Sequence, residues 1–155
     1  MFHFGVLSSR MHRAWVDITS GRLKSDIRYS VKLTYNTFPW PFCAPDSESD
    51  AALAPAHQAQ ATIEKEAKAV LDARAQFAGS SLADLYDPLT MPPALLKAHQ
   101  RLDAAVDKAY QGAGGPKAYK NDAERVAFLF TLYQRITSLL PAAQAPRRTA
   151  RRKPA

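Results

Sequence analysis

The spacing of apolar residues between residues 57 and 140 constrains the fold most, because it repeats every three or four positions. This period is typical of helices that bury one face. A first helix is expected near residues 57–77. A second should follow Pro92-Pro93, since proline suits the first turn of a helix. The three predicted helical stripes comprise Ile63, Ala67, Val70, Leu71, Arg74, Phe77, then Leu95, His99, Leu102, Val106, Ala109, Tyr110, and finally Val126, Leu129, Phe130, Tyr133, Ile136 and Leu140.

The third helix opens at "NDAERV", where Asn121 can cap and Glu124 stands three residues later, a capping-box pattern. The glycine-rich residues 112–116 predict a turn before it. We expect the three helices to form an antiparallel bundle. Periodicity alone assigns this bundle a structural role.

The first 42 residues have a different pattern and predict a small α/β unit. Residues 2–8 read as a short strand, and Ser8 or Ser9 can then cap a helix that Gly21 ends. The stretch "RYSVKLTY" (28–35) alternates and is rich in β-branched and aromatic residues, so it predicts a second strand. Pro39 and Pro41 prevent its continuation. Such a unit buries too little surface to be stable alone.

Four regions follow from these patterns. They are the α/β unit (1–42), an acidic, proline-bounded linker (43–56), the helical domain (57–141) and a basic, disordered tail (142–155). The expected fold class is therefore α+β, an incomplete α/β piece followed by a mainly helical bundle.

Positive charge lies at the two ends of the chain. The formal net charge is +7. Residues 1–42 contribute +4, residues 43–146 contribute −2, and the tail contributes +5. Basic patches favour a polyanion, and nucleic acid is the commonest one. For the tail, a disordered solubilising end is an equally good interpretation.

Several classes of protein are disfavoured. No run of eighteen apolar residues indicates a membrane span, and the N-terminus lacks the pattern of a signal peptide. The lone Cys43 cannot form an internal disulfide and suits a reducing cytoplasm. We therefore expect a cytoplasmic protein with no membrane partner.

No catalytic or metal-binding set emerges from the sequence. The four histidines are scattered, and His99 on its apolar stripe is more typical of a hydrogen-bonded core histidine than of a ligand. Pro45-Asp46 with Glu66 and Lys68 formally matches a PD…ExK nuclease pattern. However, residues two apart on a helix diverge by about 200°, so Glu66 and Lys68 would not act together.

The stretch "GRLKSDIRYS" is the strongest candidate for a binding site. If residues 22–28 are extended, Arg22, Lys24, Asp26 and Arg28 point to one side. Lysine and arginine can donate to guanine, and aspartate can accept from the amino group of cytosine. We expect Arg10, Arg13, Arg22 and Lys32 to hold DNA phosphates. A plain surface strand remains the alternative.

Long stretches of this sequence also resemble a known family. "HFGVLSSRMHRAWV", "GRLKSDIRYS", "YNTFPWP", "SLADLYDPLTMPPALLKAHQRLDAAVDKAY" and "NDAERVAFLFTLYQ" are similar, in order, to the C-terminal end of the MmeI-like enzymes. Those are large fusions of a nuclease with an adenine-N6 DNA methyltransferase that uses S-adenosylmethionine. The resemblance runs from about residue 2 to residue 140.

The resemblance implies the end of a target-recognition domain followed by a helical domain, with double-stranded DNA as partner. It places Lys24, Asp26 and Arg28 among the positions that choose bases. The FxGxG cofactor motif and the NPPY-type catalytic motif of the family are absent from these 155 residues. We therefore expect no cofactor in this chain, no independent catalysis, and a truncated or split gene product whose partner is a separate upstream methyltransferase subunit. The basic tail has no family role.

A second hypothesis stays open at this point. The chain would then be a non-enzymatic helical interaction protein whose tail binds nucleic acid non-specifically. A neighbouring reading frame that encodes FxGxG and NPPY would favour the enzyme fragment.

Overall fold

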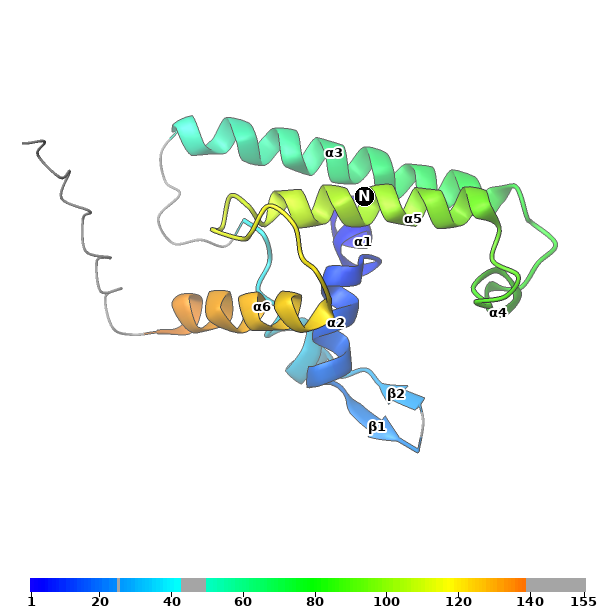
Figure 1. The fold of residues 1–155 in the computed structure, drawn as a ribbon, viewed down its shortest axis with the longest axis horizontal. Helices are drawn as coiled ribbons and strands as arrows, with labels where there is room; N and C mark the ends of the chain where they lie inside the picture. The colour runs from blue at the N-terminus through cyan, green and yellow to red at the C-terminus, as the bar shows by residue number, and fades with distance from the viewer. Residues whose placement is uncertain (25, 43–49, 139–155) are drawn as a thin grey trace, which may run out of the picture.

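The computed structural model describes residues 1–24, 26–42 and 50–138. Two short helices, α1 (Phe2–Leu7) and α2 (Arg10–Thr19), precede an antiparallel hairpin of β1 (Gly21–Leu23) and β2 (Asp26–Arg28). A π-helix, η1 (Val31–Tyr35), follows. The remaining helices are α3 (Asp50–Ala75), α4 (Leu82–Leu85), α5 (Pro93–Ala109) and α6 (Asp122–Thr137) (Figure 1). The expected α+β class is confirmed.

The strand expected over residues 2–8 is wrong, because this segment is helix α1. A short apolar run does not distinguish strand from helix by itself. Helix α1 packs on α3, and Gly5 makes the close approach possible. A Cβ at Gly5 would lie 2.7 Å from Ile63 Cγ2, so only glycine fits without a shift.

The strand expected over residues 28–35 is also wrong. Strand β2 ends at Arg28, and Ser30 caps η1 by accepting a hydrogen bond from the Leu33 N–H at 3.2 Å. Two contacts from α2 hold the π-helix: the Trp15 indole N–H donates to the Thr34 carbonyl at 3.1 Å, and Ser20 Oγ lies 2.9 Å from Thr34 Oγ1. Thr34 is fully buried as a result.

The core extends from α3 and α5, which form an antiparallel pair, to α2 and α6 (Figure 1). Helix α1 reaches this pair from below, and α2 continues away from it toward the hairpin. The largest fully buried side chains come from both parts of the chain; they are Trp15, Tyr110, Met11, Ile63, Leu95, Leu102, Leu129, Leu132, Val6, Val70 and Val106.

The prediction that three antiparallel helices form a bundle is wrong for the third helix, α6. Helix α6 packs against α2, and it runs in the same direction as α5 in Figure 1. The apolar face of α6 therefore covers part of the N-terminal unit: Trp15 contacts Phe130 and Tyr133, with ring centroids 5.1 and 6.1 Å apart. The small α/β unit is completed by helices from the rest of the chain.

The predicted helix starts are largely confirmed. Ser9 caps α2, Pro93 begins α5, and the Asn121 side chain accepts from the Glu124 N–H at 2.9 Å. Glu124 itself accepts from the N–H of Lys120, one residue before the cap.

The regions expected between and after the domains need one correction. Helix α3 begins at Asp50, so residues 50–56, expected in the linker, are helical and include Pro55. The rest of the expected linker (43–49) and the basic tail (142–155) lie outside the described residues. In the described part of the chain, no helix is long and apolar enough to cross a membrane.

Candidate nucleic-acid interface

The candidate interface is the hairpin Gly21–Arg28, which projects from the helical body at the end of α2 (Figure 1). Its register pairs Gly21 with Arg28, Arg22 with Ile27, and Leu23 with Asp26. Opposed residues share a face of a two-stranded ribbon. Asp26 and Arg28 therefore lie on one face with Leu23, and Arg22 lies on the other.

This register corrects the single row of charges predicted for residues 22–28. The chain reverses between Leu23 and Asp26, so Arg22 does not point the same way as Asp26 and Arg28. Lys24 stands at the tip, with a φ of 57°. That left-handed conformation is uncommon for a residue with a side chain, and it belongs to tight hairpin turns.

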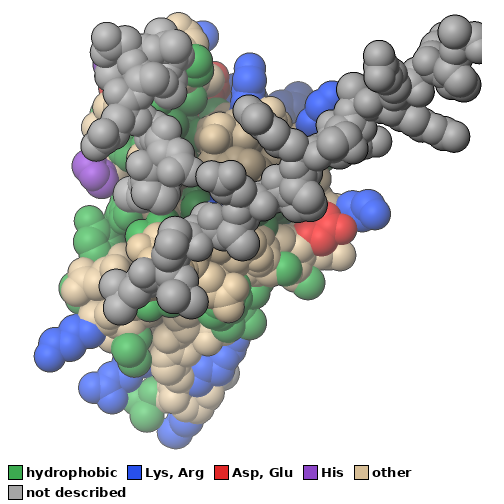
Figure 2. Space-filling model, turned by 90° about the vertical axis from the view of Figure 1, so that its left-hand side faces the viewer, with side chains coloured by type: hydrophobic (Ala, Val, Ile, Leu, Met, Phe, Trp, Pro, Cys, Tyr) green, Lys and Arg blue, Asp and Glu red, His purple; other side chains and the backbone are tan. Residues whose placement is uncertain are grey.

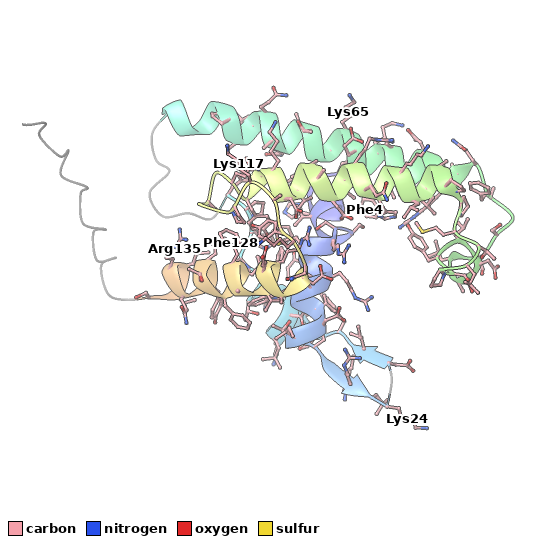
Figure 3. The ribbon with its side chains drawn as sticks, in the orientation of Figure 1. Phe4, Lys24, Lys65, Lys117, Phe128 and Arg135 are labelled. Carbon is pink, nitrogen blue, oxygen red and sulfur yellow. The ribbon has the colours of Figure 1, made fainter. Side chains whose placement is uncertain are left out.

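The predicted base-reading residues are exposed along the hairpin, from Lys24 at the tip to Arg28 at the base. Lys24, Asp26 and Arg28 are all exposed, and none of them makes an ion pair with another described residue. Lys24 points away from the body in Figure 3. Their charges are therefore available to a ligand.

The four predicted phosphate contacts differ from one another. Arg10 already binds residues of the helical domain. Its guanidinium Nε lies 2.8 Å from Asp122 Oδ1, and its backbone N–H donates to Asp103 at 2.7 Å. Arg13 and Arg22 both pair with Asp17, at 3.2 and 3.9 Å. These exposed pairs are weak, and salt or a phosphate can replace them.

Lys32 is the fourth predicted phosphate contact. It lies on the exposed arc of η1, between Val31 and Leu33, and has no ion pair within the described residues. Lys32 and the hairpin residues therefore form the least neutralised cationic surface of the N-terminal unit.

One contact that the sequence did not predict fixes the hairpin to the body. Tyr29 follows β2 directly, and its hydroxyl lies 3.2 Å from His12 Nε2 on α2. His12 is buried against Phe38, with ring centroids 4.6 Å apart. Burial lowers the pKa of His12 to about 4, so its ring is neutral at pH 7. In the sequence, the burial of His12 is indicated only by its position one helical turn before the apolar Val16.

A groove of about 750 Å³ lies beside this contact, between α2, Tyr29 and the helical domain. A second tyrosine–histidine pair lines it: Tyr86 Oη lies 2.6 Å from His99 Nε2, and Arg74 Nε donates to the same hydroxyl at 2.7 Å. Burial, and to a lesser degree the Arg74 cation, lowers the pKa of His99. His99 is thus hydrogen-bonded, as predicted, but it is only partly buried and lies at the groove, outside the core.

The alternative chemistries find no support in the geometry. No group of three potential metal ligands comes together in the described residues. Glu66 accepts from Arg101 at 3.0 Å, and Lys68 pairs with Asp72 at 2.7 Å, both on α3. Asp46, the third member of the nuclease pattern, lies outside the described residues, as does Cys43.

The N-terminal unit and the helical domain thus form a single structure in which a helical framework presents an exposed, charged hairpin. Two family models match in the same order. The model "MmeI, target recognition domain" matches residues 1–42, and the model "MmeI, C-terminal domain" matches residues 54–141. The chain belongs to the MmeI family.

Two relatives show how much of such a protein this chain represents. It is 39% identical over 137 residues to DNA methyltransferase A of Bacillus subtilis (strain 168), covering 88% of this chain and 14% of that protein. It also matches the solved structure of the Type IIL restriction-modification enzyme MmeI in complex with DNA, with a TM-score of 0.72 and 45% identity. That match covers 89% of this chain and 16% of the MmeI chain.

Proposed function

We propose that this chain is the DNA-recognition and helical part of an MmeI-like adenine-N6 DNA methyltransferase system, in which the hairpin reads bases. The exposed hairpin carries the proposal. Lys24, Asp26 and Arg28 carry charges that no described residue neutralises. They project from a segment that matches a target-recognition model.

The shape of the hairpin suits this role. The major groove of B-DNA is about 12 Å wide and admits a two-stranded β-ribbon. A ribbon that enters by its tip brings Lys24 to the base edges first. Asp26 and Arg28 then follow on one face, where a carboxylate can accept from cytosine and a guanidinium can donate to guanine.

The cations behind the tip would hold the DNA backbone. Lys32 and Arg22 are exposed near the hairpin, and Arg13 lies further along α2. Arg10 is a poorer candidate for a phosphate contact, because two of its guanidinium nitrogens already donate hydrogen bonds to Asp122. Phosphate contacts of this kind give affinity and register but no sequence choice.

Catalysis would come from elsewhere in the system. The motifs that hold S-adenosylmethionine and the target adenine in this family do not occur in these 155 residues. A methyltransferase portion with those motifs would therefore act as the partner, and this chain would select the site. Within this proposal the chain itself binds no cofactor.

The direct test is DNA binding by the purified chain over a range of salt concentrations, with a randomised duplex pool. We expect sequence-dependent affinity. Lys24→Ala should weaken binding to the preferred duplex by about 1–3 kcal/mol and relax the choice at one position. Lys65→Ala is the matched control, because Lys65 is an exposed lysine on α3 at the opposite end of the molecule (Figure 3).

Two results would contradict the proposal. One is equal weakening by the two lysine substitutions. The other is steeply salt-dependent binding without sequence preference, which would favour the non-enzymatic protein with a non-specific tail. A charge exchange extends the test: the changes equivalent to Lys24→Glu and Asp26→Arg in a full-length relative should alter the methylated sequence.

A further inference from the structure

An apolar surface beside the hairpin is left uncovered by the described residues of this chain. Ile18 on α2 and Val31 and Leu33 on η1 are 58%, 62% and 63% exposed. Helix η1 buries Thr34 against α2 and turns Val31, Lys32 and Leu33 outward. We call Ile18, Val31 and Leu33 the η1 patch.

The η1 patch stands out from the rest of the described surface. Five of the twelve exposed large apolar side chains fall between residues 18 and 33, although that stretch is a small part of the chain. In Figure 2 the hairpin end of the molecule shows hydrophobic side chains between Lys and Arg. Clustered exposed apolar residues mark interaction surfaces.

DNA is a poor occupant for this patch. The residues proposed to read bases lie on the hairpin, and the neighbouring apolar Leu23 shares the face of Asp26 and Arg28. Val31 and Leu33 lie beyond the hairpin, on a separate helix that α2 holds in place. Phosphates favour cations and helix N-termini, and large aliphatic side chains offer them no hydrogen bond.

We propose that the η1 patch binds the portion of an MmeI-like enzyme that these 155 residues do not contain. The length of the relatives supports this occupant: the chain accounts for 14% of DNA methyltransferase A and 16% of the MmeI chain, so most of each relative has no counterpart here. The patch lies within the target-recognition match, whose 42 residues are a small unit with few strands. An apolar protein surface from that portion would cover Ile18, Val31 and Leu33 and leave the hairpin free. Lys32 lies between Val31 and Leu33, and its long apolar stem would pack at the edge of this contact while its ammonium group stays in solvent, available to a phosphate.

This inference rests on the proposed function for the identity of the partner, but it is tested separately. The probe is DNA methyltransferase A from which the segment matched by this chain has been removed, co-expressed with the intact 155-residue chain. We expect the two to co-purify as a one-to-one complex. Val31→Ser and Leu33→Ser together should weaken the complex at least tenfold.

Leu89→Ser is the matched control. Leu89 is 94% exposed in the turn after α4, away from the hairpin, so the same loss of an exposed leucine should leave the complex unchanged. The substituted side chains are largely exposed in the isolated chain, and circular dichroism should show its fold intact. DNA affinity of each variant, measured without the probe, should stay within twofold of the original.

Four outcomes would overturn the inference. They are no complex with the original chain, equal loss with the patch and control variants, a homodimer of this chain that the patch variants abolish, and a loss of DNA affinity in the patch variants. A failure of sequence-dependent DNA binding with the complex retained would reject the proposed function alone.

Discussion

The charged residues of the hairpin are exposed, whereas Arg125 at the junction of α5 and α6 is buried and paired. At the hairpin, Lys24, Asp26 and Arg28 are exposed and unpaired within the described residues. At the junction, Arg125 on α6 is buried, with its side chain 8% exposed. Its guanidinium lies 2.6 Å from Asp107 on α5 and 3.2 Å from Asp122, and it covers the ring of Tyr119.

The difference separates charges that stabilise this protein from charges that the described residues do not neutralise. A buried charge must be paired, since its desolvation is costly, and removal of one partner leaves the other uncompensated. An exposed charge costs little and contributes little to stability. The hairpin can therefore change its charges without changing the fold, which is what a recognition element needs.

The largest effect is expected at the buried pair. Arg125→Ala should lower the free energy of unfolding by about 3–5 kcal/mol, because Asp107 loses its main partner. Urea denaturation followed by circular dichroism measures this change. Lys68→Ala, which removes the exposed pair with Asp72, should cost only about 0–1 kcal/mol. Equal losses would remove the distinction between the two kinds of charge.

The second effect concerns acid. The unfolded chain binds a proton at His12 near pH 6.5, but in the folded chain burial lowers the pKa to about 4. Between these values protons favour the unfolded state, so stability is full above pH 6.5 and falls toward pH 4, by roughly 3 kcal/mol. Denaturation at several pH values measures this slope. His12→Gln should make it shallower, and His99, whose pKa is lowered too, should account for some of the remainder.

The third effect tests the contact between the N-terminal unit and α3. Gly5→Ala should destabilise the chain by about 1–3 kcal/mol, although alanine favours helices, because the new methyl would overlap Ile63 and crowd Ala67. Thermal unfolding gives the change. Gly79→Ala is the control, since nothing lies within 4 Å of a Cβ there. A Gly5→Ala variant more stable than the original chain would show that the α1–α3 contact can accommodate a methyl group.

The smallest effect on stability is expected at the hairpin. Lys24→Ala and Arg28→Ala should each change the free energy of unfolding by no more than about 0.5 kcal/mol. Their effect on DNA affinity should be larger than that. A loss of several kcal/mol in urea would instead assign these residues a structural role and contradict the comparison.

Much of the helical domain could be predicted from the sequence, because local signals suffice for it. The apolar stripes predicted α3, α5 and α6, and Pro93 and Asn121 predicted two helix starts. The N-terminal unit was less predictable. Residues 2–8 and 28–35 have an apolar, β-branched composition, yet they form α1 and, from residue 31, η1, because α3 and α2 offer them partners.

The candidate site shows the same division. The residues of the hairpin were predicted, and they are exposed as a binding site requires. Their arrangement was not predicted, because a turn at Lys24 reverses the chain and moves Arg22 to the other face. The contact between His12 and Tyr29 spans seventeen residues and has no local signature.

The sequence by itself determined the helical stripes, the caps and the charged stretch from Arg22 to Arg28, since each depends on neighbours a few positions away. Its long similar stretches also determined the family. Only the tertiary structure decided that α6 packs on α2, that Gly5 meets Ile63, and that the described residues leave Ile18, Val31 and Leu33 exposed. Those features depend on which surfaces meet across the chain, and the burial of apolar area settles that choice only when all the elements are present.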